Sequence, residues 1–296
     1  MLSDINRNFI IPPKPQILSD LQDLASKEDP ALFEAADIIV KDLAISAAIL
    51  KIINSPAYGL SRTVSDIKQA VMFLGWDGVN SLVQGLKLKQ MFSTDNSCIS
   101  LERFWDTSTE IAHVNMIIGQ RFKNQVSLES LYTLGLFHDC GVPPMAIKYD
   151  NYVKALHHAD RTNKETIVEI EERMFKTNHA VIGYYFANSW HLPKEICDII
   201  LIHHDVKMLE HITDTEEQLS LAILKMAENI VNIVKRGSPL SDWHIIEGNV
   251  LDILHLSEDD KLDLQEDPPK MAAMTPNEVE TPTAELPIAA SDLVEG

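Results

Sequence analysis

The residues with the clearest capacity for chemistry in this sequence are its histidines, of which there are eleven. A neutral imidazole is a common ligand of divalent transition metals, and carboxylates often complete the coordination. Candidate ligands of these two types occur in four short groups, namely His138 with Asp139, His179, the pair His203 and His204, and Glu228. They could serve one metal site only if the fold brings the four groups together.

Each group also has an ordinary structural explanation. His138 and Asp139 follow the apolar segment 131–137, and a His-Asp pair at a helix end is usually a cap or a local hydrogen bond. His179 suits the start of a helix, and a histidine pair suits the negative end of a helix dipole. Glu228 within a long helical segment is typical of a solvated face. The metal hypothesis therefore depends on the order of the groups taken together.

The elements that must position these residues are helical almost throughout, because apolar residues recur every three or four positions. No segment alternates in the way a strand does, so the sequence predicts an all-α fold. Residues 43–53 are apolar nearly all round, which predicts a helix buried in the middle of a bundle. We expect helices at about 15–26, 30–40, 43–53, 67–74, 77–92, 101–122, 127–138, 162–175, 178–190, 193–204, 215–235 and 241–255.

Composition restricts the class of protein. The formal net charge is -19, which argues against binding nucleic acid or an anionic membrane, since both need a surplus of Lys and Arg. Three widely spaced cysteines, Cys98, Cys140 and Cys197, imply no disulfide framework and fit a reducing compartment. No apolar segment is long enough to cross a bilayer. We therefore expect a soluble, cytoplasmic protein.

A polar cluster at residues 93–97 predicts a boundary between an N-terminal helical lobe, 10–95, and a second helical lobe, 100–255. Residues 257–296 differ in kind, with eleven acidic side chains, two basic ones, five prolines and no aromatic residue. Such a segment cannot bury enough apolar surface to offset its chain entropy, so we expect a disordered acidic tail.

The order of the motifs resembles the HD superfamily of metal-dependent phosphohydrolases, and is most similar to its HDOD branch. In the first lobe the resemblance is carried by Ile11-Pro12-Pro13, residues 42–46, residues 50–55, Tyr58 and residues 64–75. In the second lobe it is carried by residues 135–141, 179–183, 190–193 and 202–204. The implied fold is a helical lobe packed on an HD-like helical lobe.

The resemblance also implies a set of metal ligands. His138 and Asp139 match the doublet that names the superfamily, and the resemblance places His179, His203 and His204 at further ligand positions. Glu228 falls about where a last aspartate ligand is expected. The implied cofactor is a divalent ion, Fe, Mn, Mg or Zn, or none if the site is degenerate.

The sequence departs from the pattern of the active enzymes. Thr107 stands where a first histidine ligand is expected, although Asp106 or His113 could compensate if the helix turned suitably. The lysine expected shortly after the doublet is missing, and only Lys148 is nearby. The Gly-Tyr-Pro signature of the cyclic-di-GMP phosphodiesterases is absent after the histidine pair. A site with these gaps is poorly equipped for phosphoester hydrolysis.

Two hypotheses from different classes remain. The first is a non-enzymatic bacterial signalling module of the HDOD type, which acts through protein partners and carries a degenerate HD metal site. The alternative is a metal-dependent phosphohydrolase acting on a nucleotide or a cyclic dinucleotide. Between them lies a site that binds metal or a nucleotide ligand without turning it over. The sequence singles out no residue as catalytic.

Overall fold

The computed structural model describes residues 9, 13–27, 30–91, 97–161 and 165–257, which form helices and their connections and no β-strand. The predicted all-α fold is confirmed. The predicted tail lies outside the described residues from 258 onward, as do most of the predicted lobe boundary and residues 11 and 12 of the first motif.

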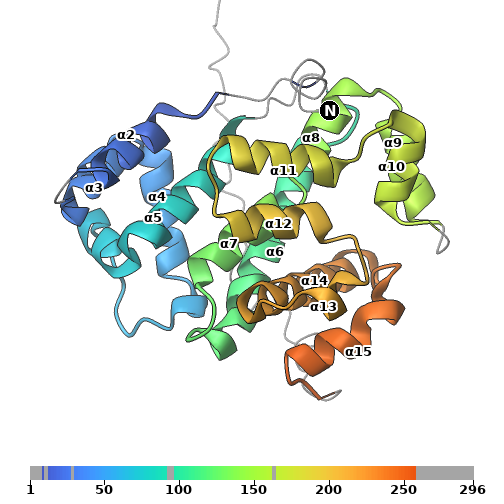
Figure 1. The fold of residues 1–296 in the computed structure, drawn as a ribbon. Helices are drawn as coiled ribbons and strands as arrows, with labels where there is room; N and C mark the ends of the chain where they lie inside the picture. The colour runs from blue at the N-terminus through green and yellow to red at the C-terminus, as the bar shows by residue number, and fades with distance from the viewer. Residues whose placement is uncertain (1–8, 10–12, 28–29, 92–96, 162–164, 258–296) are drawn as a thin grey trace, which may run out of the picture.

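The N-terminal helices pack around one long element, α5. They lie together in blue on the left of Figure 1, and α5 contacts α2, α3 and α4. Gly75 has a φ of 71° and interrupts α5, so the chain turns sharply there, as the sequence predicts. The elements of this part are α2 Gln16–Ala25, α3 Leu32–Ile39, α4 Leu43–Ile53, the short 3-10 helix η1 Pro56–Tyr58 and α5 Ile67–Met91.

Helix α4 has the predicted bounds but not the predicted environment. Asp42 begins it by accepting a hydrogen bond from the backbone of Ile45 at 3.1 Å, which satisfies one of the free amide groups of the first turn. Ile45 and Ile49 are fully buried, whereas Leu43 is 80% exposed. The prediction of a helix buried on all sides is therefore wrong, because α4 packs through one face against α5.

The remaining helices form the larger part of the molecule. In Figure 1, α11 and α12 lie over α7 and α6 at the centre, and α14 runs below them. The elements are α6 Leu101–Gly119, η2 Gln120–Phe122, α7 Leu128–Phe137, α8 Val142–Lys148, α9 Tyr152–Ala159, α10 Ile167–Phe175, α11 His179–Ser189, α12 Lys194–Ile202, α13 Met208–His211, α14 Thr215–Arg236 and α15 Trp243–Ile253.

The sequence did not predict the short helices α8, α9 and α13. The N-terminal helices join the rest through α5, which packs on α7, and the buried apolar side chains form one cluster across both parts. The division into two lobes remains a prediction.

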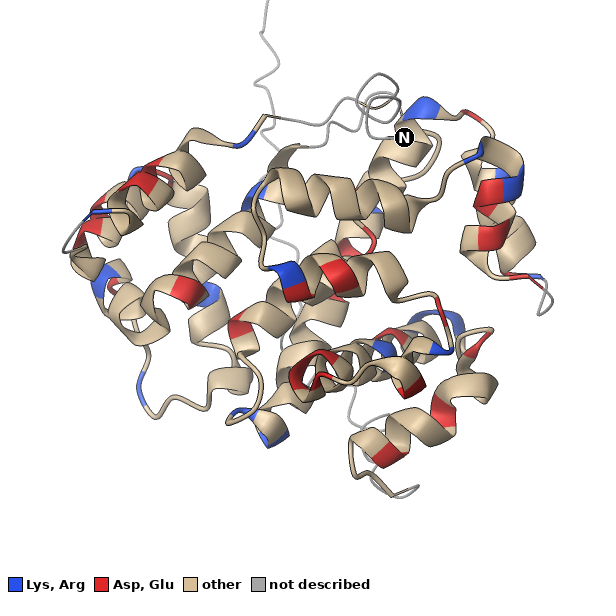
Figure 2. Cartoon of the chain, in the orientation of Figure 1, with Lys and Arg blue, Asp and Glu red and all other residues tan. Residues whose placement is uncertain are grey.

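Charge is spread over the surface of the described helices. In Figure 2, Lys and Arg are scattered among Asp and Glu, and no basic cluster stands out in this view. None of the described helices combines the length and the apolar character needed to cross a membrane.

Candidate metal centre

The His-Asp doublet sits in a tight turn between two helices. His138 ends α7, and Gly141 precedes α8 two residues after Asp139. A Cβ atom on Gly141 would lie 2.0 Å from the backbone oxygen of His179, so only glycine allows the turn to approach α11 this closely. This contact brings the doublet and the start of α11 together.

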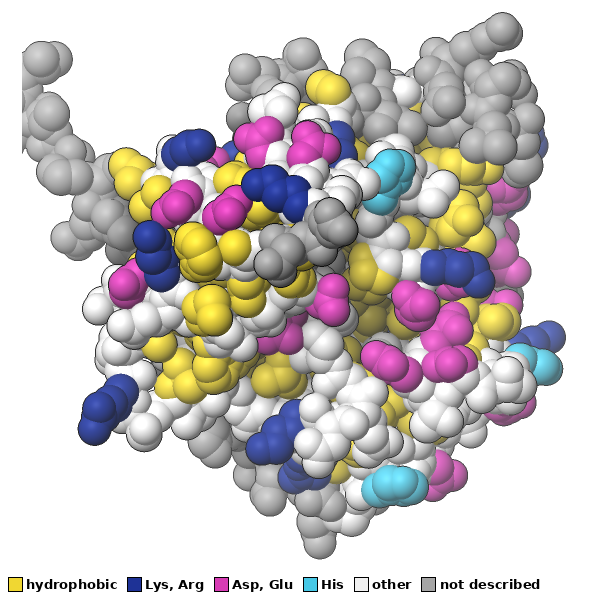
Figure 3. Space-filling model, turned by 60° about the vertical axis from the view of Figure 1, so that its left-hand side comes forward, with side chains coloured by type: hydrophobic (Ala, Val, Ile, Leu, Met, Phe, Trp, Pro, Cys, Tyr) yellow, Lys and Arg dark blue, Asp and Glu magenta, His cyan; other side chains and the backbone are white. Residues whose placement is uncertain are grey.

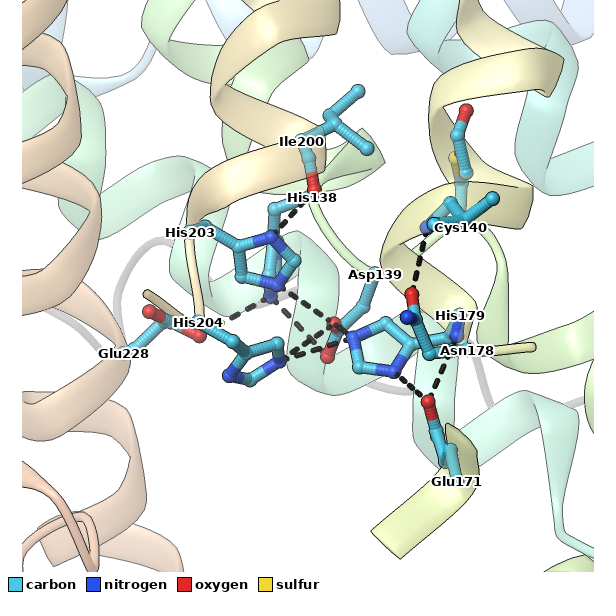
Figure 4. Close-up of polar contacts among 12 residues, drawn as sticks. His138, Asp139, Cys140, Glu171, Asn178, His179, Ile200, His203, His204 and Glu228 are labelled. Carbon is cyan, nitrogen blue, oxygen red and sulfur yellow. Dashed lines mark hydrogen bonds and ion pairs between the residues drawn. The ribbon is translucent and has the colours of Figure 1, made fainter. Parts of the chain in front are cut away.

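Four candidate ligands converge on one point. Figure 4 shows the rings of His179, His203 and His204 turned towards the Asp139 carboxylate, and one ligand atom from each of the four lies within 4.8 Å of all the others. Their Nε2 atoms are 3.1, 3.3 and 3.9 Å from Asp139 Oδ1, in that order. The doublet turn, the start of α11 and the end of α12 supply these residues.

The other two predicted ligands lie next to the four-residue cluster, near the other oxygen of the same carboxylate (Figure 4). His138 Nε2 is 3.5 Å from Asp139 Oδ2 and 3.6 Å from Glu228 Oε1. Glu228 comes from the middle of α14 and is buried. All six residues named from the sequence therefore lie in one place, although two of them stand outside the four-residue cluster.

The imidazoles are oriented for metal binding. Nδ1 of His138 lies 2.7 Å from the Gly135 carbonyl oxygen, and Nδ1 of His203 lies 2.7 Å from that of Ile200. A carbonyl oxygen can only accept, so Nδ1 carries a proton, and in the neutral form of each ring the Nε2 lone pair faces the Asp139 carboxylate. Such outer contacts fix the tautomer of metal-binding histidines in general.

Glu171 gives His179 the same orientation and was missed by the sequence analysis. This carboxylate is fully buried in α10 and accepts from both Nδ1 and the backbone N–H of His179, each at 2.8 Å. The hydroxyl of Tyr152 donates to its other oxygen. No motif in the sequence marks Glu171 as part of a site, because it lies eight residues before His179 and in a different helix.

The charges of the cluster are strongly coupled. Burial alone would raise the pKa of Asp139, but the surrounding imidazoles hold it well below its usual value. Burial opposes a charge on His179, yet the Glu171 carboxylate raises the pKa of this histidine to about 10. Burial and the neighbouring His203 hold the pKa of His204 well below its usual value. The carboxylates of Asp139 and Glu171 thus attract a cation, while His204 stays uncharged and can offer a nitrogen lone pair to a metal ion.

The donor set fits a divalent ion. Three imidazole nitrogens and a carboxylate oxygen are typical ligands of zinc, iron and related ions, and His179 Nε2 and His204 Nε2 approach within 3.0 Å of each other. Two lone pairs at that distance repel each other unless a proton or a metal ion lies between them.

The predicted replacements for the missing ligand do not reach the cluster. Thr107 lines the cavity beside the site, but its hydroxyl donates to the Arg103 carbonyl oxygen at 2.9 Å. Asp106 is exposed and faces Lys89 at 3.8 Å. His113 is buried against Tyr132, and burial together with nearby lysines lowers its pKa to about 4.

The nearby lysine does not compensate either. Lys148 Nζ lies 4.1 Å from the centre of the Phe9 ring, in a cation–π contact, so its ammonium group is directed at an aromatic ring. A different lysine, Lys225, is buried beside the site and donates to Glu228 at 2.9 Å. Burial alone would lower the pKa of Lys225, but the charge of Glu228 raises it. Lys225 was not among the site residues expected from the sequence.

A cavity of about 1180 Å³ opens onto the cluster. Its walls come from α9 and α10 on one side and from α14 and α15 on the other, and His138, Asp139, His179 and His204 lie on its surface. A small molecule in this cavity would have direct access to the candidate ligands.

The family model of the HDOD domain matches residues 11–206 of this sequence. The chain belongs to the HDOD family. The HDOD chain is 23% identical over 197 residues to an uncharacterized protein of Treponema pallidum, and the match covers 66% of the chain and 38% of that relative. The chain thus spans about two fifths of the length of this relative.

Solved structures share the fold of the HDOD chain. An HDOD domain protein of unknown function from Geobacter sulfurreducens is 23% identical, with a TM-score of 0.65 and coverage of 92% of this chain and 94% of that one. A protein from Shewanella amazonensis, provisionally named a phosphohydrolase, is 18% identical, with a TM-score of 0.64 and coverage of 93% and 96%. At these identities the likeness establishes the fold alone.

Proposed function

We propose that this HDOD chain is a regulatory signalling module that holds a divalent metal ion and acts through a protein partner without hydrolysing a phosphoester. The observation that carries the proposal is that the site has some of the expected metal ligands in place and lacks another. Asp139 is surrounded by three imidazoles, two of them oriented by outer partners, whereas none of the described residues replaces the missing histidine at Thr107. Asp139, His179, His203 and His204 would hold the ion, which would supply Lewis-acid chemistry when bound.

The charge of the cavity supports a role other than nucleotide hydrolysis. Among the described residues that line the cavity, three are Lys or Arg, and each has a carboxylate within 3.0 Å: Lys225 pairs with Glu228, Lys235 with Glu110 and Arg236 with Asp160. A phosphate group would have to compete with these carboxylates. Hydrolysis of a phosphoester also requires stabilisation of the charge that develops on the phosphate.

Exposed apolar side chains on the N-terminal helices support contact with a protein partner. Leu43, Met72 and Phe73 are 80%, 60% and 52% exposed, and Phe33 on α3 and Val40 just after it are also half exposed. Figure 3 views the molecule from this side and shows hydrophobic side chains gathered over these helices. Exposed apolar surface of this kind commonly marks a protein interface.

The alternative function is a metal-dependent phosphohydrolase acting on a nucleotide or cyclic dinucleotide. It is favoured by the size of the cavity and by its opening onto the ligand cluster.

Metal content and hydrolysis together separate the two functions. The protein would be purified without a chelator or a histidine tag and its metal measured by elemental mass spectrometry, beside Asp139→Ala and the exposed control Asp150→Ala. We expect metal in the wild type and the control, none in Asp139→Ala, and no cleavage across a panel of phosphoesters with added Mn²⁺, Fe²⁺ or Mg²⁺. Cleavage that disappears in Asp139→Ala would establish the alternative. Absence of metal from all three proteins would contradict the proposed metal site.

A further inference from the structure

Two sets of donors lie nearest to different oxygens of the Asp139 carboxylate. On the Oδ1 side lie three imidazoles, whose Nε2 atoms are 3.1, 3.3 and 3.9 Å away. On the Oδ2 side lies His138 at 3.5 Å, and beyond it Glu228 at 3.6 Å from the same imidazole nitrogen. The second set, with two carboxylates and one imidazole, could by residue type serve a second divalent ion.

The ammonium group of Lys225 lies beside this second set of donors. Lys225 and Glu228 lie three residues apart on α14, and the Lys225 ammonium donates to Glu228 Oε2 at 2.9 Å. The side chains are 5% and 9% exposed, so both charges are withdrawn from water. A buried carboxylate is tolerated only with a compensating positive charge, which Lys225 supplies.

We infer that the Lys225 ammonium takes the electrostatic place of a second metal ion, so that the site holds one divalent ion per chain, on the Oδ1 side of Asp139, and Glu228 is not a ligand. A dication bound between Asp139 Oδ2 and Glu228 would share the Glu228 carboxylate with the ammonium and be repelled by it. The inference rests on the proposed metal site and specifies how many metal ions that site binds.

The number of bound ions tests the inference directly. Metal-free protein would be titrated with Mn²⁺ alone, and bound ions per chain would be counted by elemental mass spectrometry after removal of free metal. We expect one ion in the wild type, two in Lys225→Met and one in the control Lys235→Met, which removes an exposed lysine of the same helix. In Lys225→Met, Glu228 loses its partner and becomes available to a second cation.

Electron paramagnetic resonance gives an independent reading. A single Mn²⁺ in the wild type should give the resolved hyperfine pattern of an isolated ion. Two Mn²⁺ ions that share the Asp139 carboxylate in Lys225→Met should couple magnetically and broaden that pattern. Retention of one isolated ion in folded Lys225→Met would overturn the inference.

A double variant keeps the test decisive if Lys225→Met fails to fold. Lys225→Met with Glu228→Leu removes both members of the ion pair, and replacing a buried pair with apolar residues is often neutral for stability. We expect this variant to bind one ion as tightly as the wild type does. A tenfold or greater loss of affinity would identify Glu228 as a ligand and overturn the inference.

The outcomes for the wild type distinguish this inference from the proposed function. Two ions in the wild type would overturn the inference and leave the metal site standing. No ion in the wild type would overturn the metal site itself, and the inference with it.

Discussion

The two parts of the molecule differ in what they bury. Among the described residues, α2–α5 bury polar side chains that carry no charge, Ser46, Ser81 and Gln84. Helices α6–α15 bury several ionisable groups, including His138, Glu171, His179, His203, Lys225 and Glu228. The first part is therefore held together mainly by apolar packing, whereas the second also depends on charges that compensate one another.

This difference explains why the candidate metal site lies among α6–α15 and not among the N-terminal helices. A buried ionisable group is costly unless it is paired, so a fold retains a cluster of them only with the partners that fix each one. Glu171, Gly135 and Ile200 supply such partners to three of the histidines. The charged groups of the N-terminal helices remain nearer the surface, as in the ion pair of Lys87 with Asp42, and Asp42 also caps α4.

The largest expected effect is on the packing of the doublet turn. Gly141→Ala would place a Cβ atom 2.0 Å from the His179 carbonyl oxygen and 2.7 Å from the Gly183 nitrogen. Because both neighbours are backbone atoms, we expect a loss of about 4–5 kcal/mol in the free energy of unfolding. Chemical denaturation measures it, with Gly248→Ala as the control, since no atom lies within 4 Å of a Cβ there. Equal stability of the two variants would refute the close approach of the turn to α11.

An intermediate effect is expected at Glu171. Glu171→Gln keeps the shape of the side chain but weakens its hold on the His179 ring, and loss of such an outer partner costs roughly 10–100-fold in metal affinity. Competition with a chromophoric chelator measures the affinity, and the exposed neighbour Glu172→Gln serves as the control. An unchanged metal affinity in folded Glu171→Gln would show that the buried Glu171 carboxylate does not contribute to metal binding.

The smallest expected effect lies in the N-terminal helices and depends on pH. The hydrogen bond from Lys87 holds the pKa of Asp42 below its usual value, so the charged form contributes stability above the usual pKa of an aspartate. Asp42→Asn keeps a good cap and should cost about 0.5 kcal/mol at pH 7 through loss of the ion pair, and Asp42→Ala about 1 kcal/mol more through loss of the cap.

The pH dependence follows from the lowered pKa of Asp42. As pH falls through this pKa, the wild type loses the contribution of the pair, so its advantage over Asp42→Asn should shrink in acid. Urea denaturation between pH 7 and pH 3 would reveal the trend. Metal content should stay at the wild-type level, and a loss of metal in Asp42→Asn would contradict the separation of the two parts.

Local sequence patterns determined much of the helical framework. The bounds of α4 and the break at Gly75 follow from apolar period, capping and proline or glycine at the ends. The same reasoning could not tell which face of α4 is covered, because apolar character does not reveal which neighbour packs there. It also missed α8, α9 and α13, which have few turns.

The sequence, with the resemblance it carries, named six residues that lie together in the structure: His138, Asp139, His179, His203, His204 and Glu228. It could not decide among Thr107, Asp106 and His113 at the missing position, because that choice depends on the rotation of α6. Nor could it place Glu171 behind His179 or Lys225 against Glu228. Helix period and ligand type are properties of short segments, whereas the approach of α7, α11, α12 and α14 depends on how distant apolar faces pack. Only the tertiary structure therefore determined which charges meet.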